Sequence, residues 1–175
     1  ALAALLSSPH FLFRFEFLPA RTAAEEPVRD LDGHELATRL SYFLWSSMPD
    51  EELDRLADDG SLLRPEVLAR QGARLLDHPR AHALAVSFAA QWLQVRNLER
   101  AAPDPERFPD FTPALKSAMR EETLRFFEYV LREDRPMHEL LDADYSFLNA
   151  DLAAYYGIAG VTGAELRRVS IAATP

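Results

Sequence analysis

The sequence predicts an all-α fold, an irregular array of about seven helices joined by proline-rich loops. Two observations carry this prediction. Helix-start signals recur along the chain, and each is followed by apolar residues at spacings of three and four. Prolines and glycines then separate these segments from one another. With 175 residues, of which 48% are hydrophobic, the chain can bury a core without support from disulfides or metals.

Composition narrows the classes of function. The chain contains no cysteine, which excludes disulfides, thiolate metal sites, a cysteine nucleophile and covalent attachment of a c-type haem. Its formal net charge of −9 argues against a nucleic-acid partner, because neutralising phosphates requires a positive face. No apolar run reaches the roughly eighteen residues that a membrane span needs. We therefore expect no nucleic acid and no membrane span among the partners.

The first part of the chain is predicted to belong to a preceding domain, with 1–18 as its tail and 19–31 as a loop. Ala1–Leu6 indicates the end of a helix, and Pro9 suits the first turn of a new one. Apolar and polar residues alternate over Phe11–Phe17, which is typical of a strand. The preceding cap signal favours a helix, and a helix is our prediction there.

The helical domain is predicted over 32–157. Asp32 should cap its first helix, and Glu35 sits three residues later as in a capping box. A second helix should begin at Asp50 and end at Gly60, where glycine can adopt a left-handed conformation.

Later helices are predicted from the same kinds of signal. Pro65 opens one helix, and His78-Pro79 ends it and starts the next. Residues 101–112 contain three prolines and should form a loop. The longest helix should begin at Thr112-Pro113, and a short one at Pro136.

The end of the domain is predicted at the last helix, which Asn149 caps and Gly157 ends. Residues 158–175 are expected to be a truncated segment, with both ends of the chain cut from something longer. Within it, 167–172 resembles a strand whose pairing partner would lie outside this chain.

The core is predicted from the apolar side of each helix. We expect the following residues to be mostly buried and close together: Leu40, Phe43, Leu84, Phe88, Trp92, Met119 and Phe126. The small residues Ala83, Ser87, Ala90 and Gln94 would form an opposite side that another helix could approach.

Candidate metal ligands do not reach the required spacing. His34-Glu35 and His138-Glu139 begin like a zinc-binding helix, but Thr38 and Asp142 stand where the second histidine is needed. Glutamates at these helix starts are better interpreted as caps. His78 and His82 are four residues apart, yet Pro79 removes the first from helical geometry, so we expect solvated surface histidines. Asp142, Asp144 and Asp151 lack the spacing of a calcium loop.

One carboxylate stands out. Glu122 lies on the apolar side of the longest helix, where burial would make it a functional candidate. The alternative, which we favour, is a structural ion pair with an arginine such as Arg39. Glu121 and Arg125 are expected to form a solvated pair at a spacing of four.

Four ordered segments resemble family 1592 of the domains of unknown function, over roughly residues 32–172. They are Leu36–Leu53 (LATRLSYFLWSSMPDEEL), Phe88–Leu93 (FAAQWL), Met119–Phe127 (MREETLRFF) and Asp144–Gly157 (DYSFLNADLAAYYG). The resemblance implies an extracytoplasmic, multidomain parent of planctomycete or myxobacterial type, often carrying a c-type cytochrome domain. It supplies no catalytic residues.

The sequence thus predicts a non-catalytic scaffold or interaction module that contacts other domains of its parent polypeptide. The alternative is part of an enzyme domain, in redox or polysaccharide chemistry, completed by sequence downstream. A deep polar pocket containing Glu122 and Arg39 would favour the enzyme, and a filled apolar core would favour the module. We expect no metal and no cofactor, and the sequence names no catalytic residue or substrate.

Overall fold

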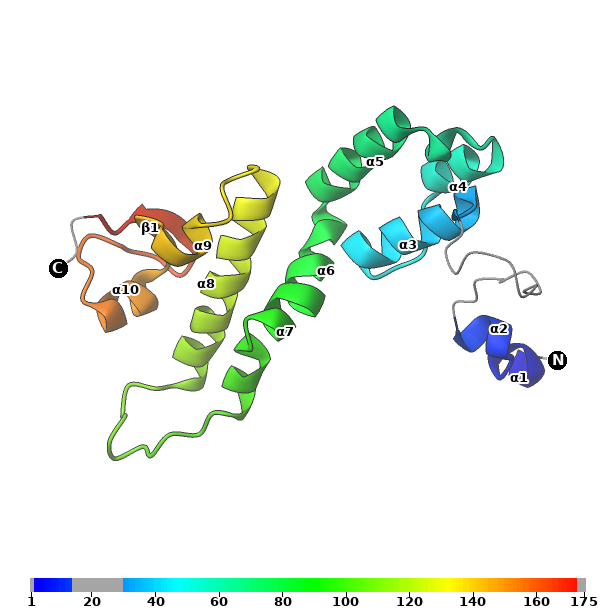
Figure 1. Cartoon of the computed structure of the whole chain (residues 1–175). Coiled ribbons are helices and arrows are strands. Elements are labelled where there is room, and N and C mark those ends of the chain that lie inside the picture. The colour runs from blue at the N-terminus through cyan, green and yellow to red at the C-terminus, as the bar shows by residue number, and fades with distance from the viewer. Residues whose placement is uncertain (1, 14–29, 173–175) are drawn as a thin grey trace, which may run out of the picture.

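The computed structural model describes residues 2–13 and 30–172, and these are predominantly helical (Figure 1). The helices and helical turns are α1 Leu2–Leu6, α2 Pro9–Leu12, α3 Gly33–Trp45, α4 Glu51–Asp58, η1 Ser61–Leu63, α5 Pro65–Asp77, η2 Pro79–Ala81, α6 His82–Leu84, η3 Ala85–Ala89, α7 Ala90–Trp92, η4 Val95–Arg100, α8 Pro113–Arg132, α9 Glu139–Asp142 and α10 Ala150–Tyr156. The strands are β1 Tyr145–Leu148 and β2 Arg167–Ser170. The predicted helical fold is confirmed in the main. It is not strictly all-α, because β1 and β2 form a small sheet, and the helical segments outnumber the seven expected.

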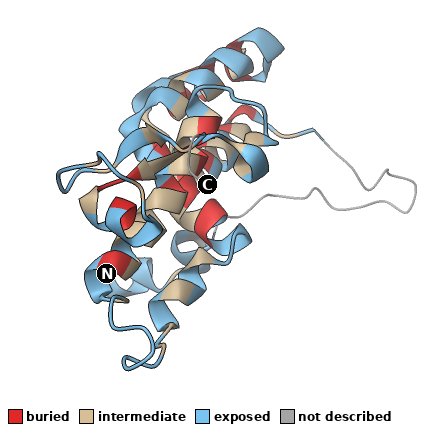
Figure 2. Cartoon of the chain, turned by 90° about the vertical axis from the view of Figure 1, so that its left-hand side faces the viewer, coloured by how far each residue is buried: buried red, intermediate tan, exposed pale blue. Residues whose placement is uncertain are grey.

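The elements lie on two sides of α8 (Figure 1). On one side, α6, η3 and α7 form a continuous helical rod that packs along α8 and connects to α3, α4 and α5. On the other side, β1 and α10 contact α8, and α9 lies at its C-terminal end. Buried residues gather where the helices meet, and the outer faces are exposed (Figure 2).

The caps predicted at Asp32 and Asn149 are confirmed, and a third cap is present at Asp50, where a helix was expected to begin. Asp32 accepts a hydrogen bond from the Glu35 amide at 2.8 Å, and the Glu35 carboxylate accepts one from the Asp32 amide at 3.0 Å. Asp50 caps α4, and Asn149 caps α10 through the Leu152 amide at 2.9 Å. Each side chain satisfies a backbone N–H that the helix itself leaves without a partner.

The N-terminal segment is helical where it is described. α1 confirms the helix predicted over the first residues, and Pro9 opens α2 as expected. α2 ends at Leu12, and the backbone of Phe13 is extended. The rest of the helix predicted through Phe17 lies outside the described residues.

The predicted core is wrong for three of its seven members. Leu84 is buried, and Leu40, Met119 and Phe126 are half-buried. The other three are exposed: Phe43 by 60%, Phe88 by 47% and Trp92 by 52%. The buried tryptophan is Trp45, which is 4% exposed.

A π-helical turn explains why the apolar stripe of the α6–α7 rod was misplaced. In η3 the Ala90 amide donates to the carbonyl of Ala85, five residues earlier. The additional residue in the turn rotates the following residues by about 100°, so a stripe drawn with uniform α-helical spacing fails. The Arg96 guanidinium donates to the carbonyls of Val86 and Ser87, which occupies acceptors within this turn.

The larger core joins α3, α4, α5, α6, η3 and α8. Alanines fill the closest approach of the rod, and Ala85, Ala89 and Ala90 are each 0% exposed. Gly33 at the start of α3 also requires a small residue, because an added Cβ would lie 2.7 Å from the carbonyl oxygen of Ala57. Trp45 fills the space at the other end of α3, and its indole donates to the Leu75 carbonyl at 2.9 Å.

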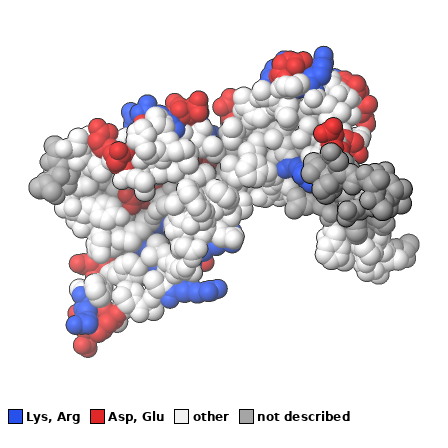
Figure 3. Space-filling model, in the orientation of Figure 1, with Lys and Arg blue, Asp and Glu red and all other residues white. Residues whose placement is uncertain are grey.

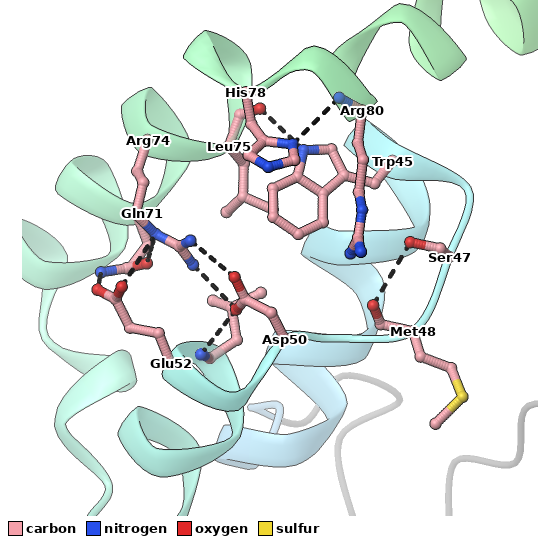
Figure 4. Close-up of polar contacts among 11 residues, drawn as sticks. Trp45, Ser47, Met48, Asp50, Glu52, Gln71, Arg74, Leu75, His78 and Arg80 are labelled. Atoms are coloured by element: carbon pink, nitrogen blue, oxygen red, sulfur yellow. Dashed lines mark hydrogen bonds and ion pairs between the residues drawn. The ribbon is translucent and has the colours of Figure 1, made fainter.

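A polar cluster beside Trp45 fixes the turn between α3 and α4 onto α5 (Figure 4). Asp50 receives two hydrogen bonds from the Arg74 guanidinium, at 2.7 and 3.0 Å. Buried Gln71 accepts from Arg74 and donates to Glu52, both at 2.6 Å. The Arg74 hydrogen bond is the main cause that holds the pKa of Asp50 below its usual value.

The C-terminal segment corrects another expectation. β2 pairs antiparallel with β1, with Tyr145 opposite Ser170 and Leu148 opposite Arg167. The strand partner predicted to lie outside the chain is therefore supplied by the chain itself. Behind the strands, Leu115, Leu148, Leu152 and Ala153 form a second, smaller core.

The two tryptophans provide a direct test of the revised core. Trp45→Ala should lower the free energy of unfolding by about 3–5 kcal/mol, because it removes a buried ring and its hydrogen bond. Trp92→Ala should cost under about 1 kcal/mol, since the ring is half exposed. Urea denaturation followed by circular dichroism measures both. Equal losses in the two variants would contradict this core.

A second test concerns pH. Because the pKa of Asp50 is lowered in the folded state, its ion pair stabilises the fold above the unfolded-state pKa of about 4 and is lost as pH falls below it. Asp50→Asn keeps a capping side chain but loses the charge, and should cost about 1–2 kcal/mol at pH 7.

The difference from the parent chain should shrink as pH falls through the acid range in denaturation experiments. Glu51→Gln is the matched control, since Glu51 begins the same helix and forms no ion pair among the described residues. A constant difference down to about pH 2, or an equal loss in the control, would contradict the assignment.

Candidate functional site

A cleft of about 420 Å³ lies on the side of α8 that faces the sheet. Its walls come from α8, α9, β1, α10 and the ends of the segments that follow α10 and β2. The lining combines two carboxylates and three hydroxyls with apolar side chains. The lining residues are Glu122, Phe126, Glu139, Leu140, Leu141, Ala143, Tyr145, Ser146, Leu148, Tyr156, Ile158 and Ile171.

Glu122 is held in the cleft by two hydroxyl donors. Ser146 on β1 donates to its Oε1 at 2.5 Å, and Tyr156 on α10 donates to its Oε2 at 2.8 Å. The half-buried carboxylate therefore ties α8 to both elements that cover it. Each of its oxygens has one protein hydroxyl as partner.

Glu139 has a different environment. Arg135 donates to both of its oxygens, at 2.7 and 3.1 Å, and the buried Tyr145 donates to Oε2 at 2.5 Å. The Arg135 contact lowers the pKa of Glu139, and the Tyr145 hydroxyl adds to the effect. Glu139 is thus held ionised and is neutralised by a protein cation.

The two tyrosines of the cleft are held neutral. Burial first, and then the hydrogen bond to Glu139, raises the pKa of Tyr145 to about 12. Burial and the Glu122 contact likewise raise the pKa of Tyr156. Both phenols consequently act as hydrogen-bond donors near neutral pH and do not supply a base.

The structure places Glu122 and Arg39 in different parts of the fold. Glu122 is half-buried on α8, as its place on the apolar side suggested, but no ion pair joins it to Arg39 within the described residues. The predicted structural pair is wrong. Arg39 lies on α3 in the other half of the fold and does not line the cleft.

The histidines at 34, 78 and 82 occupy surface positions. His34 lies 3.2 Å from Asp58, and His82 lies 2.8 Å from Glu128. His78 has the extended backbone that Pro79 imposes, and its ring packs 4.7 Å from that of Trp45. The prediction of exposed histidines at 78 and 82 is confirmed, although each ring has a protein partner.

Two predictions for the charged residues fail. Glu121 pairs with the adjacent Arg120 at 2.9 Å and not with Arg125, because Arg120 lies between Glu121 and Glu99 and reaches both. Glu139 does not cap α9 and instead enters the cleft, where Arg135 and Tyr145 of β1 donate to its carboxylate. Glu35 does cap its helix, as expected.

The described part of the chain contains no group of three or more side chains suited to hold a metal ion. The three aspartates considered for a calcium loop, Asp142, Asp144 and Asp151, are exposed. None of the helices within residues 2–13 and 30–172 combines the length and the apolarity that crossing a membrane requires. On the face drawn in Figure 3, positive and negative side chains are interspersed.

Sequence reasoning found Glu122 but missed its partners. Ser146 is 24 residues away and Tyr156 is 34 residues away, so local spacing could not join them. One signal was available. Glu122 lies in the third segment of the family resemblance, and both partners lie in the fourth.

Residues 31–158 match the model of PSD4, described as a protein of unknown function (DUF1592). The chain belongs to this family. The match covers well over half of the chain and includes α3 to α10. Neither a curated protein nor a solved structure matches the chain. Membership of the DUF1592 family therefore brings no established activity, and the function must be argued from the geometry.

Proposed function

We propose that this DUF1592 domain is a non-catalytic interaction module that docks onto other domains of a larger polypeptide. The observation that carries the proposal is a stacked aromatic pair on its surface. Phe88 and Trp92 lie with ring centroids 5.8 Å apart, and about half of each side chain is exposed. Together with the neighbouring Leu93 they form what we call the aromatic surface.

The aromatic surface has the chemistry of a protein interface. Aromatic side chains are enriched at the centres of such interfaces, where they bury a large area at small entropic cost. Alanines on the same rod pack into the core in place of these rings. The domain therefore has a contiguous apolar core and still exposes large apolar groups, which is expected of a module with a partner.

The N-terminal helices support the same interpretation. α1 has no buried residue among those described, and large apolar side chains of α1 and α2 are exposed. These side chains are Leu2, Leu5, Leu6, Phe11 and Leu12, and Phe13 directly after α2 is exposed as well. We infer that this segment belongs to a preceding domain, which would cover it.

The rival function, part of an enzyme domain, would have to use the cleft beside Glu122. Its tyrosines have raised pKa values, and Glu139 is ionised and paired with Arg135. None of these groups is poised to exchange protons near neutral pH. The cleft lacks Arg39, which the sequence had linked to the enzyme hypothesis. These contacts favour binding over catalysis.

The family resemblance also bears on the cellular location of the parent protein and on its other domains. We propose that the parent is an extracytoplasmic, cytochrome-linked protein of planctomycete type. Cell fractionation with antibody detection of the parent tests its location, and a haem stain of the intact polypeptide tests the cytochrome link. Recovery in the cytosolic fraction, or a parent without haem, would contradict the corresponding part.

The docking proposal can be tested with fluorine NMR. The chain has two tryptophans, so 5-fluorotryptophan labelling should give two resonances, which Trp92→Phe assigns. In the isolated chain, the Trp92 signal should shift between H₂O and D₂O, because the ring is half exposed. In the full parent this solvent shift should be largely lost, whereas the Trp45 signal stays insensitive in both. A Trp92 signal that is equally solvent-sensitive in the parent would contradict docking there.

Substitutions provide the matched control. Phe88→Ser and Trp92→Ser should weaken the coupling between domains in the parent, seen as separate unfolding transitions in calorimetry. Phe108→Ser removes an aromatic side chain that is also about half exposed, but lies in the loop before α8. It should leave the coupling intact. Equal effects of all three substitutions would contradict a role for the aromatic surface.

A further inference from the structure

The charges in the cleft are not balanced. Glu139 is neutralised by Arg135, but Glu122 has only the hydroxyls of Ser146 and Tyr156 as partners. No lysine, arginine or histidine of the described residues forms an ion pair with Glu122. A half-buried carboxylate without a cation keeps part of its attraction for a positive charge, because the cleft screens it less than bulk water does.

The remaining acceptor capacity of Glu122 favours one type of cation. Each carboxylate oxygen already accepts one hydroxyl hydrogen bond, and each can accept about one more. A guanidinium prefers to approach both oxygens side by side, along a direction that has to be free of other donors. An ammonium is a compact charge with rotatable donors and can use a single open position. A metal ion would need further ligands, which the described residues do not gather here.

The other walls of the cleft are suited to an apolar body. Phe126, Leu140, Leu148, Ile158 and Ile171 line it together with the carboxylates. Phe126 is held in place by stacking on Tyr145, with ring centroids 5.3 Å apart. A volume of about 420 Å³ lies within the range of small-ligand pockets and suits a ligand of modest size.

We propose that this cleft binds a small organic ammonium ion, with Glu122 as its counter-charge and the apolar walls around its hydrocarbon part. Ser146 and Tyr156 hold the carboxylate in position from opposite oxygens. The overall charge of −9 also attracts cations to the molecule. This site is separate from the aromatic surface, and the two proposals can fail independently.

A matched pair of probes tests the charge requirement. Benzylamine is protonated near pH 7, and benzyl alcohol has nearly the same shape without the charge. In ¹H–¹⁵N NMR titrations of the chain, benzylamine should shift the amides of Ser146, Tyr156 and Ile171 in a saturable manner. Benzyl alcohol should bind at least about tenfold more weakly. Equal affinity of the two probes, or no saturable shift up to about 10 mM benzylamine, would overturn the proposal.

Substitutions assign the effect to one carboxylate. Glu122→Gln should weaken benzylamine binding by about tenfold or more, while leaving the weak binding of benzyl alcohol unchanged. Glu121→Gln is the matched control, because it removes the same charge one position away, from a residue paired with Arg120. It should change the affinity by less than about twofold. Equal effects of the two variants would show attraction by net charge alone and overturn the site.

A fold defect in Glu122→Gln can be distinguished from loss of the site. Glu122→Asp retains the charge on a shorter side chain and should keep the preference for benzylamine over benzyl alcohol, even if both bind more weakly. If this variant folds by circular dichroism and shows no preference, the charge of Glu122 does not select the ligand.

Discussion

The fold depends on α8 serving two cores at once. Leu124 and Phe127 belong to the larger core with α3, α6 and η3, whereas Leu115 belongs to the smaller core with β1 and α10. A helix of 20 residues has enough surface to bury one stripe against each partner. Two carboxylates of α8 have partners on opposite sides of the helix. Glu122 accepts hydrogen bonds from Ser146 of β1 and Tyr156 of α10, whereas Glu128 lies 2.8 Å from His82 of α6.

The α6–α7 rod packs closely against its neighbours because its core-facing side chains are small. Ala85, Ala89 and Ala90 are fully buried, which lets the rod approach α8 and α3 at short range. Because alanines occupy the core-facing positions of the rod, its large aromatic side chains lie at other positions on the helix. Here the π-helical turn leaves Phe88 and Trp92 half exposed, where they stack on each other and Phe88 also contacts Phe127 in a tilted arrangement. The exposed pair is thus a consequence of how the core is filled.

Local chemistry made much of the fold predictable, and non-local pairing set the limit. The caps at Asp32, Asp50 and Asn149 act within three residues, so their signals can be recognised in the sequence alone. The prediction that Phe88 and Trp92 are buried was wrong because one additional residue in the π-helical turn changes the register of the helix. The sequence carries no signal for such a turn. Only one strand of the sheet was predicted. The strand expected over 167–172 is confirmed as β2, but its partner β1 was missed, because Tyr145 and Ser170 are far apart in the chain and a four-residue strand with few alternating positions gives little signal.

The candidate site shows the same limit more sharply, since it exists only when three distant elements meet. Glu122 could be selected because it stands on the apolar side of a long helix, but its chemistry is decided by the hydroxyls opposite it. A nearby arginine would have made it a structural ion pair, which was the favoured expectation. Ser146 and Tyr156 instead each donate one hydrogen bond to its oxygens without neutralising its charge. Their hydrogen bonds also join α8 to β1 and α10, so anything that engages Glu122 acts on the contacts that hold the smaller core against the helix. Occupancy of the cleft and the stability of the C-terminal elements are therefore linked through one carboxylate.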